Sequence, residues 1–184
     1  MNEITAKRYK TLDMVYIAMF AILISVCSWI YIPTAIPFTL QTFAVLCTVG
    51  LLGGKRGTLA VLLYIIMGAV GLPVFAGFTG GLGILFGETG GYLIGFIFTA
   101  LSYALITRLF GKKTLIIILA MIVGILLCYT FGTAWFMYVY MHNTGAVGLA
   151  AVLGWCVVPF ILPDLVKLAL AVIIVKRLAP HVHI

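Results

Sequence analysis

Two charged side chains, Asp164 and Lys167, lie inside the last long apolar stretch of the chain, residues 152–175. Placing one ionised group at membrane depth costs about 2.5–3.5 kcal/mol even on insertion scales. A helix puts residues three apart on one face, one turn from each other, so the two side chains can pair. The pair predicts either a binding site that offers a ligand an acceptor and a charged donor, or an ion pair that fastens this helix to its neighbours.

Two prolines close to this pair favour the first alternative. Because proline has no N–H, Pro159 and Pro163 leave the carbonyls of Trp155 and Pro159 without their helical partners. Inside a bilayer such carbonyls must face a cavity or another helix rather than lipid. The small side chain of Ala171, one turn beyond Lys167, leaves further room, so we expect this segment to be a pocket wall.

The sequence offers few residues that could carry out catalysis. From the first apolar stretch to the end of the last, the acids are only Glu88 and Asp164, and the one histidine, His142, is expected in a solvated loop. The sequence has no H-E-x-x-H, serine-elbow or Walker-lysine motif. We therefore expect no cofactor, no metal and no ATP hydrolysis by this chain. A small intramembrane enzyme that uses Asp164 remains the alternative.

The composition predicts that the chain lies in a membrane. Of the 184 residues 65% are hydrophobic and only 8% are charged, which is typical of an integral membrane protein. The apolar stretches predict an all-α protein of one membrane domain, residues 1–184, with six transmembrane helices. The predicted spans are residues 14–32, 38–53, 58–72, 90–108, 114–140 and 153–176. The four cysteines are scattered through these spans without metal-like spacing, so we expect buried thiols.

A glycine-rich stretch, residues 73–91, separates the third and fourth predicted spans. It has seven glycines between Gly77 and Gly91, too many for one helix, and it is too apolar for an ordinary solvated loop. We expect it to form an extracellular lid, because glycine allows tight turns and lets backbone N–H groups approach a ligand.

The basic residues predict the orientation of the chain. Ten of the eleven Lys and Arg fall before the first span, after the last, or in alternate loops, and Lys167 is the exception. Three of them, Lys7, Arg8 and Lys10, precede the first span. The loops of the other side, residues 32–38, 73–91 and 141–154, carry one formal charge, on Glu88. The positive-inside rule therefore places both termini in the cytoplasm. Since these basic residues flank the membrane instead of forming one patch, we do not expect nucleic acid as a partner.

Polar residues gather instead at the outer ends of the predicted spans. Gln41 begins the second span, Thr89 and Tyr92 flank the start of the fourth, and Asp164 with Lys167 lies in the sixth. A mostly apolar pocket with a few placed hydrogen-bonding groups is the usual site for a small molecule. We therefore expect such a pocket to face outward.

The first span has one face of small side chains, which includes Ala18, Ala21 and Ser25. Small residues at this spacing let a second helix approach closely. The pattern alone predicts either packing within the protein or docking of a partner helix.

Several of these segments together resemble the BioY family, the biotin-binding substrate components of energy-coupling-factor (ECF) vitamin transporters. The segments are residues 39–42 (TLQT), 71–77 (GLPVFAG), 80–83 (GGLG), 89–96 (TGGYLIGF), 132–135 (GTAW) and 163–167 (PDLVK). The resemblance covers nearly the whole chain, and its most specific parts are the glycine-rich stretch and the D-x-x-K pair. Glu88 departs from the family, which commonly has proline before Thr-Gly-Gly-Tyr, and it could alter the lid or add charge at the mouth.

The resemblance implies a multi-pass protein of the bacterial cell membrane that captures biotin from outside. It would sit in membrane lipid and work with a transmembrane scaffold protein and two cytoplasmic ATPases. The small-residue face of Ala18, Ala21 and Ser25 corresponds to the surface that such components use to meet the scaffold, which favours docking over internal packing. Related components share the architecture and differ in the pocket, so thiamine or riboflavin remains an alternative ligand.

The chemistry of biotin agrees with the residues found. Asp164 can accept hydrogen bonds from the ureido N–H groups and Lys167 can donate to the ureido carbonyl, both charge-assisted. The carboxylate would then meet the N–H groups of the glycine-rich stretch; in the reverse orientation Lys167 would hold the carboxylate. The expected binding residues are Phe38, Gln41, Gly80, Gly81, Thr89, Gly90, Gly91, Tyr92, Trp135, Asp164 and Lys167.

Overall fold

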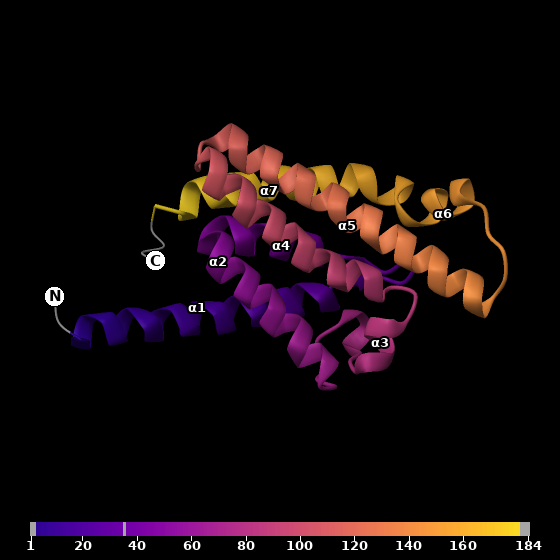
Figure 1. Cartoon of the computed structure of the whole chain (residues 1–184), viewed down its shortest axis with the longest axis horizontal. Helices are drawn as coiled ribbons and strands as arrows, with labels where there is room; N and C mark the ends of the chain where they lie inside the picture. Colours follow the sequence, from indigo (N-terminus) through magenta and orange to yellow (C-terminus); the bar gives the residue numbers. More distant parts are fainter. Residues whose placement is uncertain (1–2, 35, 181–184) are drawn as a thin grey trace.

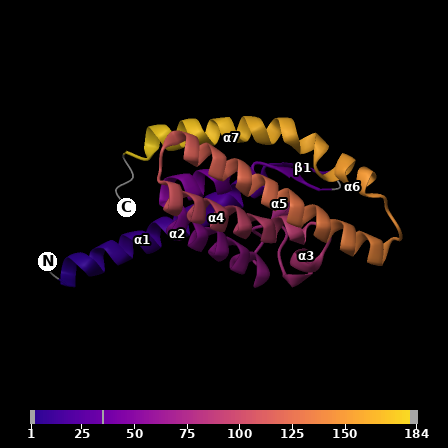
Figure 2. The ribbon, with the colours of Figure 1, turned by 45° about the horizontal axis from the view of Figure 1, so that its top comes forward.

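The computed structural model describes residues 3–34 and 36–180, with side chains described from residue 11 on. Its long helices lie side by side along the longest axis (Figures 1 and 2). They are α1 (Glu3–Trp29), α2 (Gln41–Ala69), α4 (Gly90–Phe110), α5 (Thr114–Asn143) and α7 (Val158–Leu178). The shorter elements are β1 (Tyr31–Ile32), β2 (Phe38–Thr39), η1 (Ala76–Phe78), α3 (Leu82–Phe86) and α6 (Leu149–Cys156). Within this part of the chain 5 helical stretches are long and apolar enough to cross a membrane, so the predicted all-α membrane fold is confirmed.

The helix α2 is broken at Gly53 and folds back on itself. Gly53 has φ 75° and ψ 172°, a conformation that is essentially restricted to glycine. The side-chain amide of Gln41 donates a 2.7 Å hydrogen bond to the hydroxyl of Tyr64. In a straight helix these residues would be about 35 Å apart, at 1.5 Å per residue. The halves of α2 therefore lie against each other, in the region where the sequence predicts two spans; the total of six spans stays a prediction.

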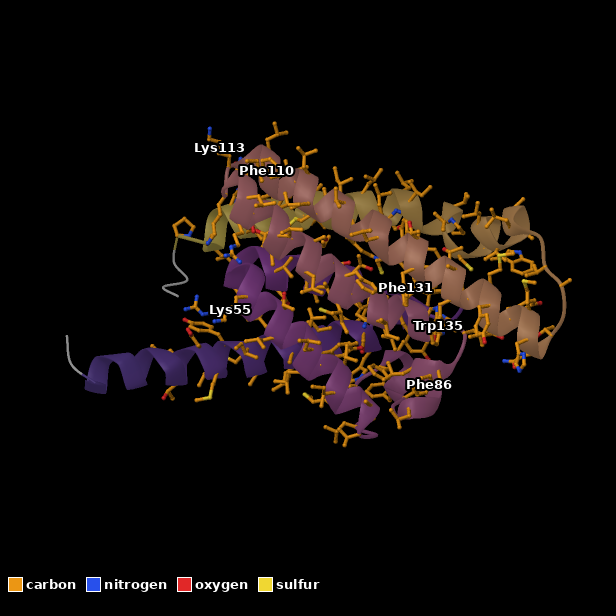
Figure 3. The ribbon with its side chains drawn as sticks, in the orientation of Figure 1. Lys55, Phe86, Phe110, Lys113, Phe131 and Trp135 are labelled. Atoms are coloured by element: carbon orange, nitrogen blue, oxygen red, sulfur yellow. The ribbon has the colours of Figure 1, made fainter. Side chains whose placement is uncertain are left out.

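The basic residues for which side chains are described gather at one end of the bundle, apart from Lys167. Lys55, just after the break in α2, and Lys113, at the start of α5, lie at the end of the bundle where α7 ends (Figure 3). At this end Arg56 Nε pairs with Asp13 Oδ1 at 2.8 Å, which joins α2 to α1. The side chains of Lys7, Arg8 and Lys10 lie outside the described residues.

The glycine-rich stretch forms η1, α3 and short turns that pack on the second half of α2. Phe75 is 1% exposed and contacts the Tyr64 ring edge-on, with ring centroids 5.5 Å apart. A Cβ added at Gly68 would lie 1.9 Å from the Phe75 ring, so only glycine permits this contact. The backbone N–H of Gly81 donates to the carbonyl of Gly68 at 2.7 Å. The stretch is thus held against α2, and its action as an extracellular lid stays a prediction.

The last apolar stretch contains a helix break inside the predicted span 153–176. The helix α5 continues to Asn143, so the exposed His142 lies in its last turn, and α6 begins at Leu149. The helix is interrupted at Val157, with φ −125° and ψ −56°, and α7 begins at Val158. Because Pro159 cannot donate to the carbonyl of Trp155, the regular hydrogen-bond ladder ends here.

The small-residue face of α1 is directed into the protein. Ala21 and Ser25 are 0% and 2% exposed, whereas Ala18 is exposed. One turn on, the Ser28 hydroxyl lies 2.6 Å from the carbonyl oxygen of Val74. This corrects the expectation that Ala21 and Ser25 belong to a docking face. Their small size allows α1 to pack closely within the chain, which is the alternative that the pattern left open.

Candidate functional site

A central cavity of about 280 Å³ lies among α2, α4, α5 and α7. Its size is near the lower end of the range for small-molecule pockets, about 300–1,000 Å³. Most of its surface is apolar, and residues of the two loops before and after α2 complete its wall. These loops lie at the end of the bundle away from the break in α2, so the cavity lies toward the end without the basic residues.

The charged pair of α7 lines this cavity. Asp164 and Lys167 are only 3% and 5% exposed, and Lys167 Nζ donates to Asp164 Oδ1 at 2.8 Å. The ammonium also lies 4.3 Å from the ring centroid of Phe38, a cation–π contact. The sequence prediction that the two charges share one helix face and pair is confirmed.

Tyr129 of α5 completes the environment of the carboxylate. Its hydroxyl donates to Asp164 Oδ2 at 2.5 Å, so both carboxylate oxygens have a donor from the protein. The sequence analysis missed this residue. A signal was present, because a tyrosine hydroxyl in the middle of an apolar span needs a partner there. The sequence does not reveal which partner, since Asp164 lies 35 residues further on.

The other predicted polar residues lie on the cavity wall. Gln41, Thr89 and Tyr92 line it together with Asp164 and Lys167. Gln41 is held by its bond to Tyr64, and the Tyr92 hydroxyl lies 3.0 Å from Thr133 Oγ1. The cavity thus brings five predicted side chains from α2, α4, α7 and the adjoining loop to one space.

The remaining predicted residues lie outside the lining. Phe38 contacts the ammonium of Lys167 and stacks on Phe160, with ring centroids 5.7 Å apart.

Trp135 donates from Nε1 to the carbonyl of Gly87 at 3.0 Å. Its side chain packs closely on α4, because a Cβ added at Gly91 would lie 2.3 Å from the Cβ of Trp135. Figure 3 shows Trp135 beside Phe131 and close to Phe86 of α3. The glycines at 80, 81 and 90 likewise lie outside the lining. Ligand contact by all of these residues stays a prediction.

The arrangement of groups decides what the cavity can recognise. The wall offers a carboxylate and an ammonium whose charges cancel, and the rest of the lining is mostly apolar with a few hydroxyl and amide groups. Within the described part of the chain no three His, Cys, Asp or Glu side chains converge as a metal site. The fold and this cavity define a class: an integral membrane protein with a pocket for a small, partly polar molecule among its helices.

Comparison with known proteins identifies the family within this class. The BioY family model matches residues 2–183, and the chain belongs to this family. It is 42% identical to the "Biotin transporter BioY" of Thermotoga maritima over 162 residues, which cover 87% of this chain and 91% of that protein. It is 39% identical to the "Probable biotin transporter BioY" of Pyrococcus horikoshii over 170 residues, 92% of this chain and 97% of that protein.

A solved structure shares the fold. It is the crystal structure of the S-component for biotin from an ECF-type ABC transporter, with a TM-score of 0.82 and 26% identity. The match covers 97% of this chain and 94% of that chain.

The hydrogen bond from Tyr129 to Asp164 should contribute measurably to stability. We expect Tyr129→Phe to lower the free energy of unfolding by about 1.5–3 kcal/mol, the contribution of a hydrogen bond to a charged group. Thermal unfolding of the detergent-purified protein measures this as a lower Tm. Tyr138→Phe is the matched control, because Tyr138 lies on the same helix and is 72% exposed. Equal Tm values for the two variants would contradict the assignment.

Proposed function

We propose that this chain captures biotin in the central cavity and serves biotin uptake as the membrane-embedded substrate-binding component of an ECF-type transporter. The observation that carries the proposal is the buried Asp164–Lys167 pair on the cavity wall. Membership of the BioY family supports it, as does the likeness to the biotin S-component. A partly polar ligand suits the pair better than a purely hydrophobic one, because only a polar ligand can use its remaining hydrogen-bonding capacity.

The pair retains hydrogen-bonding capacity for the ureido ring of biotin. An ionised carboxylate has about four lone-pair sites and an ammonium has three donors. Tyr129 and Lys167 occupy two of the sites on Asp164, and Lys167 uses one of its own donors in doing so. Asp164 can therefore accept from a ureido N–H while Lys167 donates to the ureido carbonyl, and the bond between them need not break.

Electrostatics favours one orientation of biotin in the cavity. The pair is neutral as a unit, and so is the ureido ring, so their contact adds no net charge to a low-dielectric site. A carboxylate placed beside the pair would add an unpaired charge, which is costly to desolvate. The carboxylate would thus point toward the loop of residues 75–89, where Thr79 is exposed.

Uptake also requires partners and an orientation in the membrane. We propose that a transmembrane scaffold protein and two cytoplasmic ATPases supply the energy, in line with the ECF-type assembly of the solved relative. We further propose that the chain lies in a bacterial cell membrane with the basic end, and so both termini, in the cytoplasm. Because Ala21 and Ser25 are buried, the proposal gives them no role in docking the scaffold.

Equilibrium titration of the detergent-purified protein tests the proposed ligand. We expect saturable binding of one biotin per chain and no comparable binding of thiamine or riboflavin, because the lining matches a ureido ring on an apolar body. Biotin should be recovered chemically unchanged. Tighter binding of thiamine or riboflavin, or conversion of the biotin, would contradict the proposal and favour another vitamin or an enzyme.

Labelling of intact cells with a membrane-impermeant thiol reagent tests the orientation. We expect Thr79→Cys and Asn143→Cys to react from outside and Lys55→Cys to react only after lysis. All three positions are exposed. The four native cysteines are buried, so the unmodified chain provides the background. Reaction of position 55 in intact cells would reverse the assignment.

A further inference from the structure

A second cavity, here called the side cavity, lies between α5 and α7 and measures about 210 Å³. Seven of its nine lining residues are aliphatic: Ile122, Ile125, Leu126, Val157, Ile161, Leu165 and Leu168. The other two are Tyr129 and Asp164. Ile125, Tyr129 and Asp164 also line the central cavity, so these three residues form a partition between the two spaces.

The side cavity is bordered by residues that face the membrane. Leu126, Ile161 and Leu165 are 56%, 46% and 53% exposed, on helices of membrane-spanning length. At the middle of such helices the surrounding medium is hydrocarbon. Asp164 lies halfway along the apolar stretch Leu149–Leu178, so the side cavity lies away from both ends of this stretch.

Water is a poor occupant for this space. The two polar residues of the lining already bond to each other, and Lys167 occupies the second carboxylate oxygen from the far side. Among the described residues no buried side-chain polar atom lacks a hydrogen-bond partner. A buried water needs two or more polar partners, and an empty apolar space forgoes dispersion contacts. A hydrocarbon chain satisfies this lining best.

We propose that the side cavity is a binding site for a lipid acyl chain. Its lining runs from Ile122 to Tyr129 on α5, about 10 Å at 1.5 Å per residue, so a segment of a lipid tail fits lengthwise between the helices. The acyl chain would contact the outer side of the Tyr129 ring, whose hydroxyl donates a hydrogen bond to Asp164. The proposed lipid site and the central cavity thus share the partition that includes Tyr129 and Asp164. The proposal holds whichever ligand the central cavity takes.

Photo-crosslinking in phosphatidylcholine vesicles tests this site. The vesicles contain a phosphatidylcholine with a mid-chain diazirine, and adducts are located by mass spectrometry after illumination. We expect more adducts on the side-cavity residues of α5 and α7 than on the apolar face of α1. Val15, Met19 and Ile22 of that face are 48%, 57% and 54% exposed, so they report on ordinary lipid contact.

Filling the side cavity provides the matched comparison. Ile161→Trp should reduce the adducts on α5 and α7 to the level of α1, whereas Leu119→Trp should leave them unchanged. Leu119 lies on α5, is 48% exposed and does not line the side cavity. If Ile161→Trp is not monodisperse in gel filtration, Leu126→Phe serves as the filling variant. The proposal is overturned if the adducts show no excess over α1, or if the excess persists in the filled variant.

Discussion

The structure depends on one constraint: two opposite charges buried at membrane depth must be neutralised together. Neither Asp164 nor Lys167 could remain ionised alone in hydrocarbon without a cost of several kcal/mol. Their mutual bond, the donor from Tyr129 and the ring of Phe38 provide a local environment that tolerates both ions. The same environment leaves lone pairs and N–H donors unused on two residues that line the central cavity. A pair that is neutral as a unit and still able to form hydrogen bonds suits the recognition of a neutral, polar ring.

The surrounding elements hold this pair on the wall of the central cavity. The break of the helix before Pro159 and the proline inside α7 belong to the segment that presents the pair. The reversal of α2 at Gly53 brings Tyr64 to Gln41 and so fixes an amide on the cavity wall. The glycine-rich stretch packs Phe75 on α2 and completes the lining from the loop side. On the far side, Tyr129 separates the central cavity from a space that is open to lipid.

The sequence predicted those features that depend on local pattern. Two charges three residues apart in an apolar stretch indicate a paired, buried site, and the glycine density of residues 73–91 indicates a segment that is not one continuous helix. Tyr129 was missed because its partner is set by the packing of α5 on α7, which no local pattern specifies. The face of Ala21 and Ser25 was misassigned because small residues favour close helix contact without specifying whether the second helix is the chain's own. For Trp135, the family resemblance indicated an aromatic residue at the cavity, whereas the fold directs its N–H to the backbone of Gly87.

The central claim is that the Asp164–Lys167 pair contacts the ligand and is more than an internal staple. The most direct test measures biotin affinity and Tm for Asp164→Asn, Lys167→Met and the double variant. Each single variant should weaken binding by about 1.5–3 kcal/mol, or roughly ten- to a hundred-fold in Kd. The double variant should recover much of the Tm, since no lone ion remains, and yet stay weak in binding. Near-normal biotin affinity in a stable double variant would contradict the account.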